Sequence, residues 1–407
     1  MRITNEKIDE AIEYSVKTIH HICENIGPRE SGTKKEEEAQ LFLKKELDEN
    51  GWADESTLER FKVARHALVG FTKIVGVVMI IASLLQLLWF VSLLAGTIAS
   101  SIGLALCVFT FMTVVLEFVF YRQFLDRFMQ NTESTNLYAK YEPTGEVKRR
   151  IVFNGHVDSA YEWTLMKIKQ NVMVGFLVFD IICLFVMIGL AIAAIIDAKL
   201  WMYVTMACMS VPFISLFFVC NFKVVVPGAN DNLTGVLNAV SVLKCLKESG
   251  VRLENTEVCC LSTGSEEAGL RGAMDWTIRH KEELDKVPTA VIAFDTLRDM
   301  DYLTIYDRDM TNLVKNDVDC SKLLDKAAQK INHPLKHGGV PFGASDAAAF
   351  SRGGLKAICV AGQDPLHANY YHNTRDTADN LRPDTMKVCL ELSLAAVEIF
   401  DKEGFGE

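Results

Sequence analysis

Apolar residues follow a helical spacing in the first part of the chain. Ile8, Ile12 and Val16 recur on what would be one helix face, and a turn at Gly27-Pro28 follows them. A second apolar-periodic segment then ends near Asn50. We therefore expect two amphipathic helices between residues 5 and 50.

Four long apolar runs then break this pattern. Each is long enough to cross a membrane as a helix, which takes roughly 20 residues. Only Gly96-Thr97 separates the first two runs, and only Asp197-Ala198-Lys199 separates the last two. Buried core helices are the alternative, but four runs in two pairs favour two transmembrane helical hairpins. The runs cover residues 74–95, 98–121, 172–196 and 200–220.

Two acidic residues stand inside these runs, where charge is costly. Asp180 lies about two helical turns into the third run, where it could face the interior of the helix bundle. Glu117 stands near the end of the second run, where it could reach the membrane interface. These two acids would also suit a transport function.

Basic residues predict the orientation of the hairpins. Lys199 is the one basic residue at their tips, whereas the opposite flanks carry Lys62, Arg65, Lys73, Arg122, Arg127, Lys167, Lys169 and Lys223. By the positive-inside rule, both termini and the polar segments face the cytoplasm. Each hairpin leaves and returns on one side, so the polar segments can form one domain. We expect that domain to comprise residues 1–70, 122–170 and 222–407, interrupted by hairpins at 71–121 and 171–221.

The polar segments alternate between strand and helix patterns. Such alternation predicts an α/β fold, with a central mixed, mostly parallel sheet that helices cover on both faces. Open sheets of this kind place their functional sites at strand ends. The expected strands are 150–154, 257–261, 290–294 and 357–360, and the expected helices are 233–246 and 386–400.

Composition narrows the possible partners. The 407 residues carry a net charge of −10 without a basic stripe, which argues against nucleic acid as a partner. The 11 cysteines form no CxxC pair, and several lie in apolar runs. We interpret them as reduced thiols, which favours a soluble part that faces the cytosol.

Five polar clusters stand at strand ends or in nearby loops. Taken alone, each fits a turn, a helix cap or a surface hydrogen bond. The Glu266-Glu267 pair, for example, also fits a solvated pair at a helix N-terminus. The clusters are Gly155–Ser159, Pro227–Gly235, Ser262–Gly272, Phe294–Thr296 and Tyr370–Thr377.

Together these clusters supply the donors of a metal site. They hold two imidazoles, three carboxylate ligands and a spare carboxylate at Glu266. Neighbouring residues of a turn point in different directions, so one glutamate of the Glu266-Glu267 pair can bind metal while the other acts as general base. Imidazole and carboxylate are good zinc ligands, and two ions can share a bridging carboxylate. The set therefore predicts two divalent metal ions, with zinc as the metal.

This ordered set resembles the co-catalytic zinc peptidase family of the MH clan, which includes bacterial aminopeptidases, glutamate carboxypeptidase and glutaminyl cyclases. The resemblance covers nearly all of the polar sequence, and Gly27–Gly32 looks like the family's N-terminal Pro-Arg-x-x-Gly turn. It implies a three-layer sandwich of the zinc-peptidase type, here in a membrane variant.

The resemblance also implies which residues bind each ion. His156 and Asp295 would bind one zinc, and Glu267 and His372 would bind the other. Asp231 would bridge the two ions.

Three further residues receive catalytic roles from the resemblance. Glu266 would take a proton from the attacking water and deliver it to the leaving amine. Asp158 would orient the His156 imidazole, and Tyr371 would stabilise the oxyanion of the tetrahedral intermediate.

Two positions depart from the family pattern. Ala347 replaces the histidine of a Ser-Asp-His segment, and Ala273 stands where serine often follows the glycine after the Glu-Glu motif. These departures concern the substrate rather than the metal ligands.

The leading hypothesis is a membrane-embedded, zinc-dependent aminopeptidase or dipeptidase that hydrolyses peptides with a metal-activated water. Its partners would be a peptide substrate and the lipid bilayer. A glutaminyl-cyclase-like acyl transferase is the first alternative. A non-catalytic membrane binding or transport protein with a peptidase-like domain is the second, although such a protein would not need Glu266.

Overall fold

A computed structural model describes residues 3–168, 170–365 and 367–406; the predicted basic flank residue Lys169 lies outside them. The chain divides into two compact units. The unit that we call the sheet unit comprises Met1–Arg65, Asn131–Ala160 and Val225–Glu407. The unit that we call the helical unit comprises His66–Gln130 and Tyr161–Val224. The boundaries expected from the sequence, with one domain interrupted by hairpins at residues 71–121 and 171–221, stay a prediction.

The sheet unit is built on one sheet, which holds nine strands within the described residues. The strand order is β1-β2-β6-β3-β7-β11-β8-β10, and β9 pairs with β8. The four central strands β6, β3, β7 and β11 run parallel, β2 and β8 pair antiparallel with the outer two of them, and β1 pairs antiparallel with β2. The strands are β1 (Glu55–Val63), β2 (Thr132–Tyr141), β3 (Arg149–His156), β6 (Thr256–Thr263), β7 (Thr289–Leu297), β8 (Leu303–Asp309), β9 (Val314–Lys315), β10 (Lys336–Gly339) and β11 (Lys356–Gly362).

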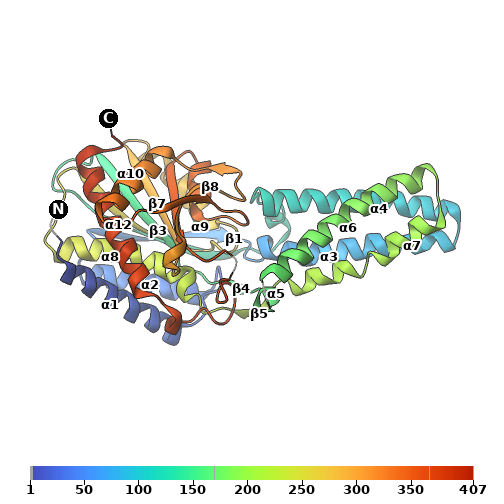
Figure 1. Ribbon diagram of the computed structural model, residues 1–407, viewed down its shortest axis with the longest axis horizontal. Coiled ribbons are helices and arrows are strands. Elements are labelled where there is room, and N and C mark those ends of the chain that lie inside the picture. The colour runs from blue at the N-terminus through green and yellow to red at the C-terminus, as the bar shows by residue number, and fades with distance from the viewer. Residues whose placement is uncertain (1–2, 169, 366, 407) are drawn as a thin grey trace. The chain divides into compact units, whose positions relative to one another are not determined.

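Helices cover both faces of this sheet (Figure 1). Side chains alternate along each strand, so Ile151 and Phe153 join the larger core while Val152 points to the opposite face. The larger core is formed with α1 (Asn5–His21), α2 (Lys34–Glu49), α8 (Thr234–Glu248), α10 (Val318–Lys330) and α12 (Pro383–Glu403). The opposite face is covered by α9 (Arg271–Leu284) and α11 (Asp346–Arg352). The predicted α/β fold with a mixed, mostly parallel sheet is confirmed.

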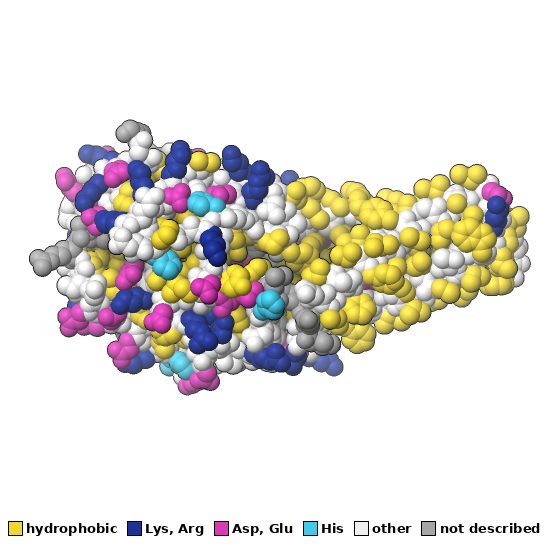
Figure 2. Space-filling model, in the orientation of Figure 1, with side chains coloured by type: hydrophobic (Ala, Val, Ile, Leu, Met, Phe, Trp, Pro, Cys, Tyr) yellow, Lys and Arg dark blue, Asp and Glu magenta, His cyan; other side chains and the backbone are white. Residues whose placement is uncertain are grey.

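Among the described residues of the helical unit, four helices are long and apolar enough to cross a membrane. They span Ala67–Phe90, Leu93–Val119, Asn171–Ile196 and Leu200–Phe218. The unit contains α3 (Ala67–Leu85), α4 (Leu93–Thr113), α5 (Thr164–Ile168), α6 (Gln170–Ile196) and α7 (Leu200–Cys208). β4 (Tyr161–Glu162) and β5 (Asn221–Val225) form a separate small sheet. Figure 2 shows hydrophobic side chains covering most of the visible face of these helices.

The turn between the first two apolar helices does not lie at the predicted link. Gly96 and Thr97 lie inside α4, and the chain turns at Val91-Ser92 instead. The reason is a helix cap, because the Ser92 side chain accepts a hydrogen bond from the backbone N–H of Ala95 at 3.0 Å.

Both acidic residues of the apolar runs are buried. Asp180 is 5% exposed and accepts a hydrogen bond from the Ser215 hydroxyl at 2.6 Å, so it faces the interior of the bundle. Glu117 is completely buried and accepts the backbone N–H of Leu125.

Candidate metal centre

The parallel strands bring the predicted site residues to one edge of the sheet. His156 is the last residue of β3, and Glu266 and Glu267 follow β6 closely. Asp295 lies near the end of β7. Asp231 lies in the short turn Ala229–Leu233 directly before α8, and His372 lies in the loop after β11. Since the carboxyl ends of parallel strands meet at the same edge, residues far apart in sequence become neighbours.

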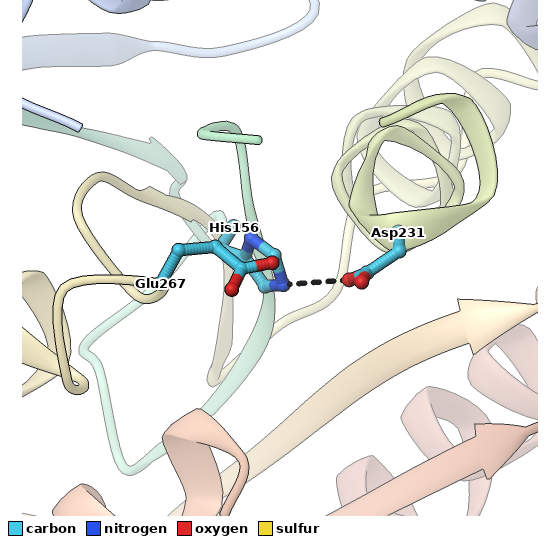
Figure 3. Close-up of side chains that lie close together, drawn as sticks. All are labelled: His156, Asp231 and Glu267. Atoms are coloured by element: carbon cyan, nitrogen blue, oxygen red, sulfur yellow. Dashed lines mark ion pairs between the residues drawn. The ribbon is translucent and has the colours of Figure 1, made fainter. Parts of the chain in front are cut away.

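Asp231 lies between the two histidines. Its Oδ1 is 3.2 Å from Nε2 of His156, and its Oδ2 is 3.1 Å from Nε2 of His372. Glu267 places Oε1 at 3.3 Å from the same His372 nitrogen. Figure 3 shows Asp231 pointing at His156 from the start of a helix, with Glu267 beside the imidazole.

Two overlapping groups have a geometry that suits metal ions. One ligand atom each from His156, Asp231 and Glu267 lies within 4.8 Å of the others, and the same holds for His156, Glu266 and Asp295. Two donors bound tetrahedrally to one zinc ion at 2.0–2.1 Å would be about 3.3 Å apart. The separations of His156 and His372 from Asp231, 3.2 and 3.1 Å, and the 3.3 Å between His372 and Glu267 are close to that spacing.

The charge of the cluster also suits cations. Burial, and then the charge of Asp231, raises the pKa of Asp295 to about 7. Burial likewise raises the pKa of Glu266 well above its usual value, against an opposing effect of His156. Burial lowers the pKa of His372, but Glu267 and Asp231 outweigh it and raise that pKa to about 10. Buried carboxylates that repel one another are stabilised by positive charge, and imidazole and carboxylate are zinc donors, so this donor set fits the predicted metal.

Asp158 contacts both the His156 imidazole and the backbone of the two glutamates. Its Oδ1 lies 3.5 Å from Nδ1 of His156. It also accepts the backbone N–H groups of Glu266 at 3.0 Å and Glu267 at 3.1 Å, and the Ser31 hydroxyl at 2.7 Å. This position allows the predicted contact of Asp158 with the imidazole. The hydrogen bonds of Asp158 to the backbone of both glutamates were not predicted from the sequence.

Arg29 joins the segment that follows His156 to the segment that precedes Asp231. Its guanidinium is completely buried and donates to the carbonyl oxygens of Val157 at 2.7 Å, Pro227 at 2.9 Å and Gly228 at 2.8 Å. The sequence indicated only a turn at this position. The signal lay in the Pro-Arg pair of the resembling motif, but the partners of the arginine are up to 199 residues away.

Asp376 holds the backbone at Asp231. This buried carboxylate accepts the backbone N–H of Asn230 at 2.9 Å, the Asn230 side-chain amide at 2.7 Å and the backbone N–H of Asp231 at 3.1 Å. The sequence placed Asp376 in the cluster of His372 without giving it a role. Its spacing of four residues from the histidine was the only available signal.

The remaining predicted residues lie as follows. The Tyr371 ring is half-buried and stacks on His372, with ring centroids 3.9 Å apart. Ala347 lies on α11 and is buried in a small cluster with Ala293 and Cys359. Ala273 is buried near the start of α9.

Comparisons with known proteins concern the family and the fold. Residues 210–397 match the model of Peptidase family M28. No curated protein matches the chain.

Solved structures resemble the whole chain in fold. An aminopeptidase from Aneurinibacillus sp. strain AM-1 is 13% identical with a TM-score of 0.56, covering 97% of this chain and 96% of its own. BSAP, a zinc aminopeptidase from Bacillus subtilis, is 13% identical with a TM-score of 0.56, covering 95% and 94%. A glutaminyl cyclase from Fimbriiglobus ruber is 14% identical with a TM-score of 0.55, covering 95% of each chain. Residues 210–397 are therefore similar to Peptidase family M28, and this match and the shared fold support the resemblance to the co-catalytic zinc peptidases that the metal-ligand motifs carry.

Proposed function

We propose that this protein is a membrane-embedded, zinc-dependent exopeptidase, an aminopeptidase or a dipeptidase. The observation that carries the proposal is the convergence of two imidazoles and four carboxylates at one buried edge of the sheet. Membrane embedding is supported by the four apolar helices, whose outer side chains include Leu94 at 70% and Ile196 at 80% exposure.

His156 and Asp295 would hold one ion, Glu267 and His372 the other, and Asp231 would lie between them. When bound, zinc would supply Lewis-acid activation of a water molecule and positive charge that keeps neighbouring carboxylates ionised. Two ions are proposed because His156 belongs to both groups of possible ligand atoms, and because Asp231 lies between His156 and His372.

Glu266 is the proposed general base. Its Oε2 is 3.8 Å from Nε2 of His156, so the carboxylate faces the cluster. The other five residues supply the metal ligands, which leaves Glu266 available as a base. It takes one proton from water as the oxygen bonds to the substrate carbonyl carbon, and it delivers that proton to the amine nitrogen as the C–N bond breaks. Asp158 holds the backbone N–H of Glu266, and Tyr371 donates a hydrogen bond to the developing oxyanion.

The test is hydrolysis of aminoacyl amides and dipeptides by the zinc-loaded protein and its Glu266→Gln variant. We expect kcat to fall about 10²- to 10⁴-fold, because a general base contributes on that order, while the zinc content stays unchanged. Glu282→Gln, an exposed substitution on α9, is the matched control. A Glu266→Gln variant as active as the control would contradict the assigned role.

A glutaminyl-cyclase-like acyl transferase is the second candidate, because cyclase structures match this fold as well as aminopeptidases do. Peptides with N-terminal glutamine separate the two reactions. A peptidase releases free glutamine, whereas a cyclase releases ammonia and leaves the peptide bond intact. One tightly bound zinc per chain would also count against the binuclear peptidase.

A further inference from the structure

The turn that carries the two glutamates is held by side chains from three other elements. Four consecutive backbone N–H groups each donate to a side-chain oxygen instead of to another backbone group. The four pairs are Gly264 to Asn136 Oδ1 at 3.0 Å, Ser265 to Glu36 Oε1 at 2.8 Å, Glu266 to Asp158 Oδ1 at 3.0 Å and Glu267 to Asp158 Oδ2 at 3.1 Å. The conformation of this turn therefore depends on acceptors supplied by β2, α2 and the loop after β3.

Among these acceptors, Glu36 is a charged type of residue buried completely inside the protein, which hydrophobic packing does not explain. It lies on α2 and is completely buried. Its Oε1 accepts the backbone N–H and the hydroxyl of Ser265, at 2.8 and 3.2 Å, and its Oε2 accepts the Gly32 N–H at 2.9 Å and the Ser134 hydroxyl at 2.8 Å. All four donors are neutral, so the site uses a buried carboxyl group as a four-way acceptor. Burying such a group is costly unless its hydrogen bonds are made.

The backbone that Glu36 holds adopts an uncommon conformation. Ser265 has a φ of 54°, in the left-handed region that residues other than glycine rarely occupy. Such a conformation persists when the surrounding structure fixes it. Ser265 is also the residue directly before Glu266, so any relaxation of its backbone moves the carboxylate of the proposed base.

The neighbours of Glu36 on α2 show that its burial is specific. Glu37 is half-buried and forms an ion pair with Arg60, and Glu38 is exposed. The helix therefore turns one of three consecutive glutamates into the protein, directly against the Ser265 turn.

We propose that Glu36 is a positioning residue for Glu266: it fixes the Ser265 backbone and thereby sets the direction of the general base. This inference rests on the proposed peptidase function. Glu36 itself touches neither substrate nor metal in this role, and it acts through the peptide that joins Ser265 to Glu266.

The experiment uses the full chain, purified in detergent and loaded with zinc, and compares Glu36→Gln with Glu38→Gln. Glutamine keeps one acceptor oxygen but presents an NH2 group either to the Ser265 N–H or to the Gly32 N–H, so the variant loses the hydrogen bond to the turn or the one that anchors residue 36. We expect kcat to fall about 10- to 100-fold through misplacement of Glu266, with KM changed by less than about threefold. Zinc content should match the control, and amide hydrogen exchange of the segment 264–267 should become faster.

A second variant covers the case in which Glu36→Gln fails to fold. Ser134→Ala removes one of the four donors and leaves the carboxyl group in place, so it should lower kcat in the same direction by a smaller factor. Normal kcat and unchanged exchange of the turn in whichever variants fold would overturn the proposal. A wild-type chain without activity on any peptide would contradict the peptidase function instead, and the exchange rates would then decide whether Glu36 holds the turn.

Discussion

At the scale of single residues, the metal ligands depend on partners that would not touch a metal. Asp376 accepts three hydrogen bonds from Asn230 and Asp231, and it is completely buried. It therefore fixes the backbone of the residue that we expect between two ions. Groups that orient a ligand in this way typically contribute 10- to 100-fold to metal affinity.

We predict that Asp376→Asn weakens zinc binding about 10- to 100-fold, because the new NH2 group faces donors that need an acceptor. Competition with a chelator measures the affinity. Asp379→Asn, at an exposed position three residues further on, should bind zinc as the wild type does. Equal affinities of the two variants would show that Asp376 has no influence on the site.

The sequence could indicate the ligands but not most of their supporting residues. His156, Asp231 and His372 belong to polar clusters at strand ends or in nearby loops, a position that the order of the chain reveals. Glu36 stands in the run Lys34–Glu38, whose members all resemble solvated helix residues. Only the packing of α2 against β2 distinguishes the buried glutamate from its neighbours. Such long-range burial leaves no local pattern.

At the scale of elements, the site depends on a close approach of α8 to β3. A Cβ atom at Gly155 would lie 2.4 Å from both the carbonyl carbon of Gly235 and the amide nitrogen of Val236. Because Gly155 precedes His156, and Asp231 lies just before α8, this contact sets how near the two ligands come.

We predict that Gly155→Ala lowers the free energy of unfolding by about 1–3 kcal/mol or more, the usual cost of overpacking against atoms that cannot move aside. Thermal unfolding of the zinc-free protein in detergent measures it. Gly175→Ala is the matched control, since a Cβ at Gly175 meets nothing within 4 Å. Equal stability of both variants would mean that α8 shifts freely away from β3.

A second prediction at this scale concerns pH and the contact of α9 with β1. His280 Nε2 lies 2.7 Å from Glu59 Oε1, and its Nδ1 lies 3.3 Å from Glu283 Oε2. Burial lowers the pKa of His280, but Glu59 and Glu283 outweigh it and raise the pKa above 6.5. The contribution of this histidine to stability is therefore complete below pH 6.5 and is lost as the pH rises through the raised pKa.

His280→Gln should remove that part of the pH dependence. We expect the difference in unfolding temperature between wild type and variant to shrink from about pH 6 to about pH 9, because the imidazolium charge disappears over that range. A difference that stays constant over the range would contradict the charge-based explanation.

The sequence predicted the central strands better than the edge strands. β3, β6, β7 and β11 contain apolar runs because both of their faces are covered. β1 alternates between exposed and buried residues, but its buried positions include the charged Glu59, so the apolar alternation that would indicate a strand is interrupted. The turn at Ser92 was missed for a similar reason, since a serine cap inside an apolar run is a weaker signal than Gly96.

At the scale of the whole molecule, the length of the apolar runs was the signal that identified the helices of the helical unit. Four apolar runs appear as four helices because an uninterrupted run needs no distant partner to be recognised. Which side of a membrane the sheet unit occupies is a separate question, and charge is the property that answers it. The flanks of the helical unit at its links to the sheet unit carry Lys73, Arg122, Lys167 and Lys223, whereas Lys199 lies between α6 and α7.

We predict that the segment between α6 and α7 faces the outside of the cell and the sheet unit faces the cytoplasm, because basic flanks are retained inside. A membrane-impermeant maleimide tests this on intact cells. The parent is a Cys208→Ser protein, since Cys208 is the exposed native cysteine. Lys199→Cys should be labelled without permeabilisation, whereas Asp379→Cys in the sheet unit should be labelled only after it. The opposite pattern would reverse the orientation, and the peptides available to the site would then be extracellular ones.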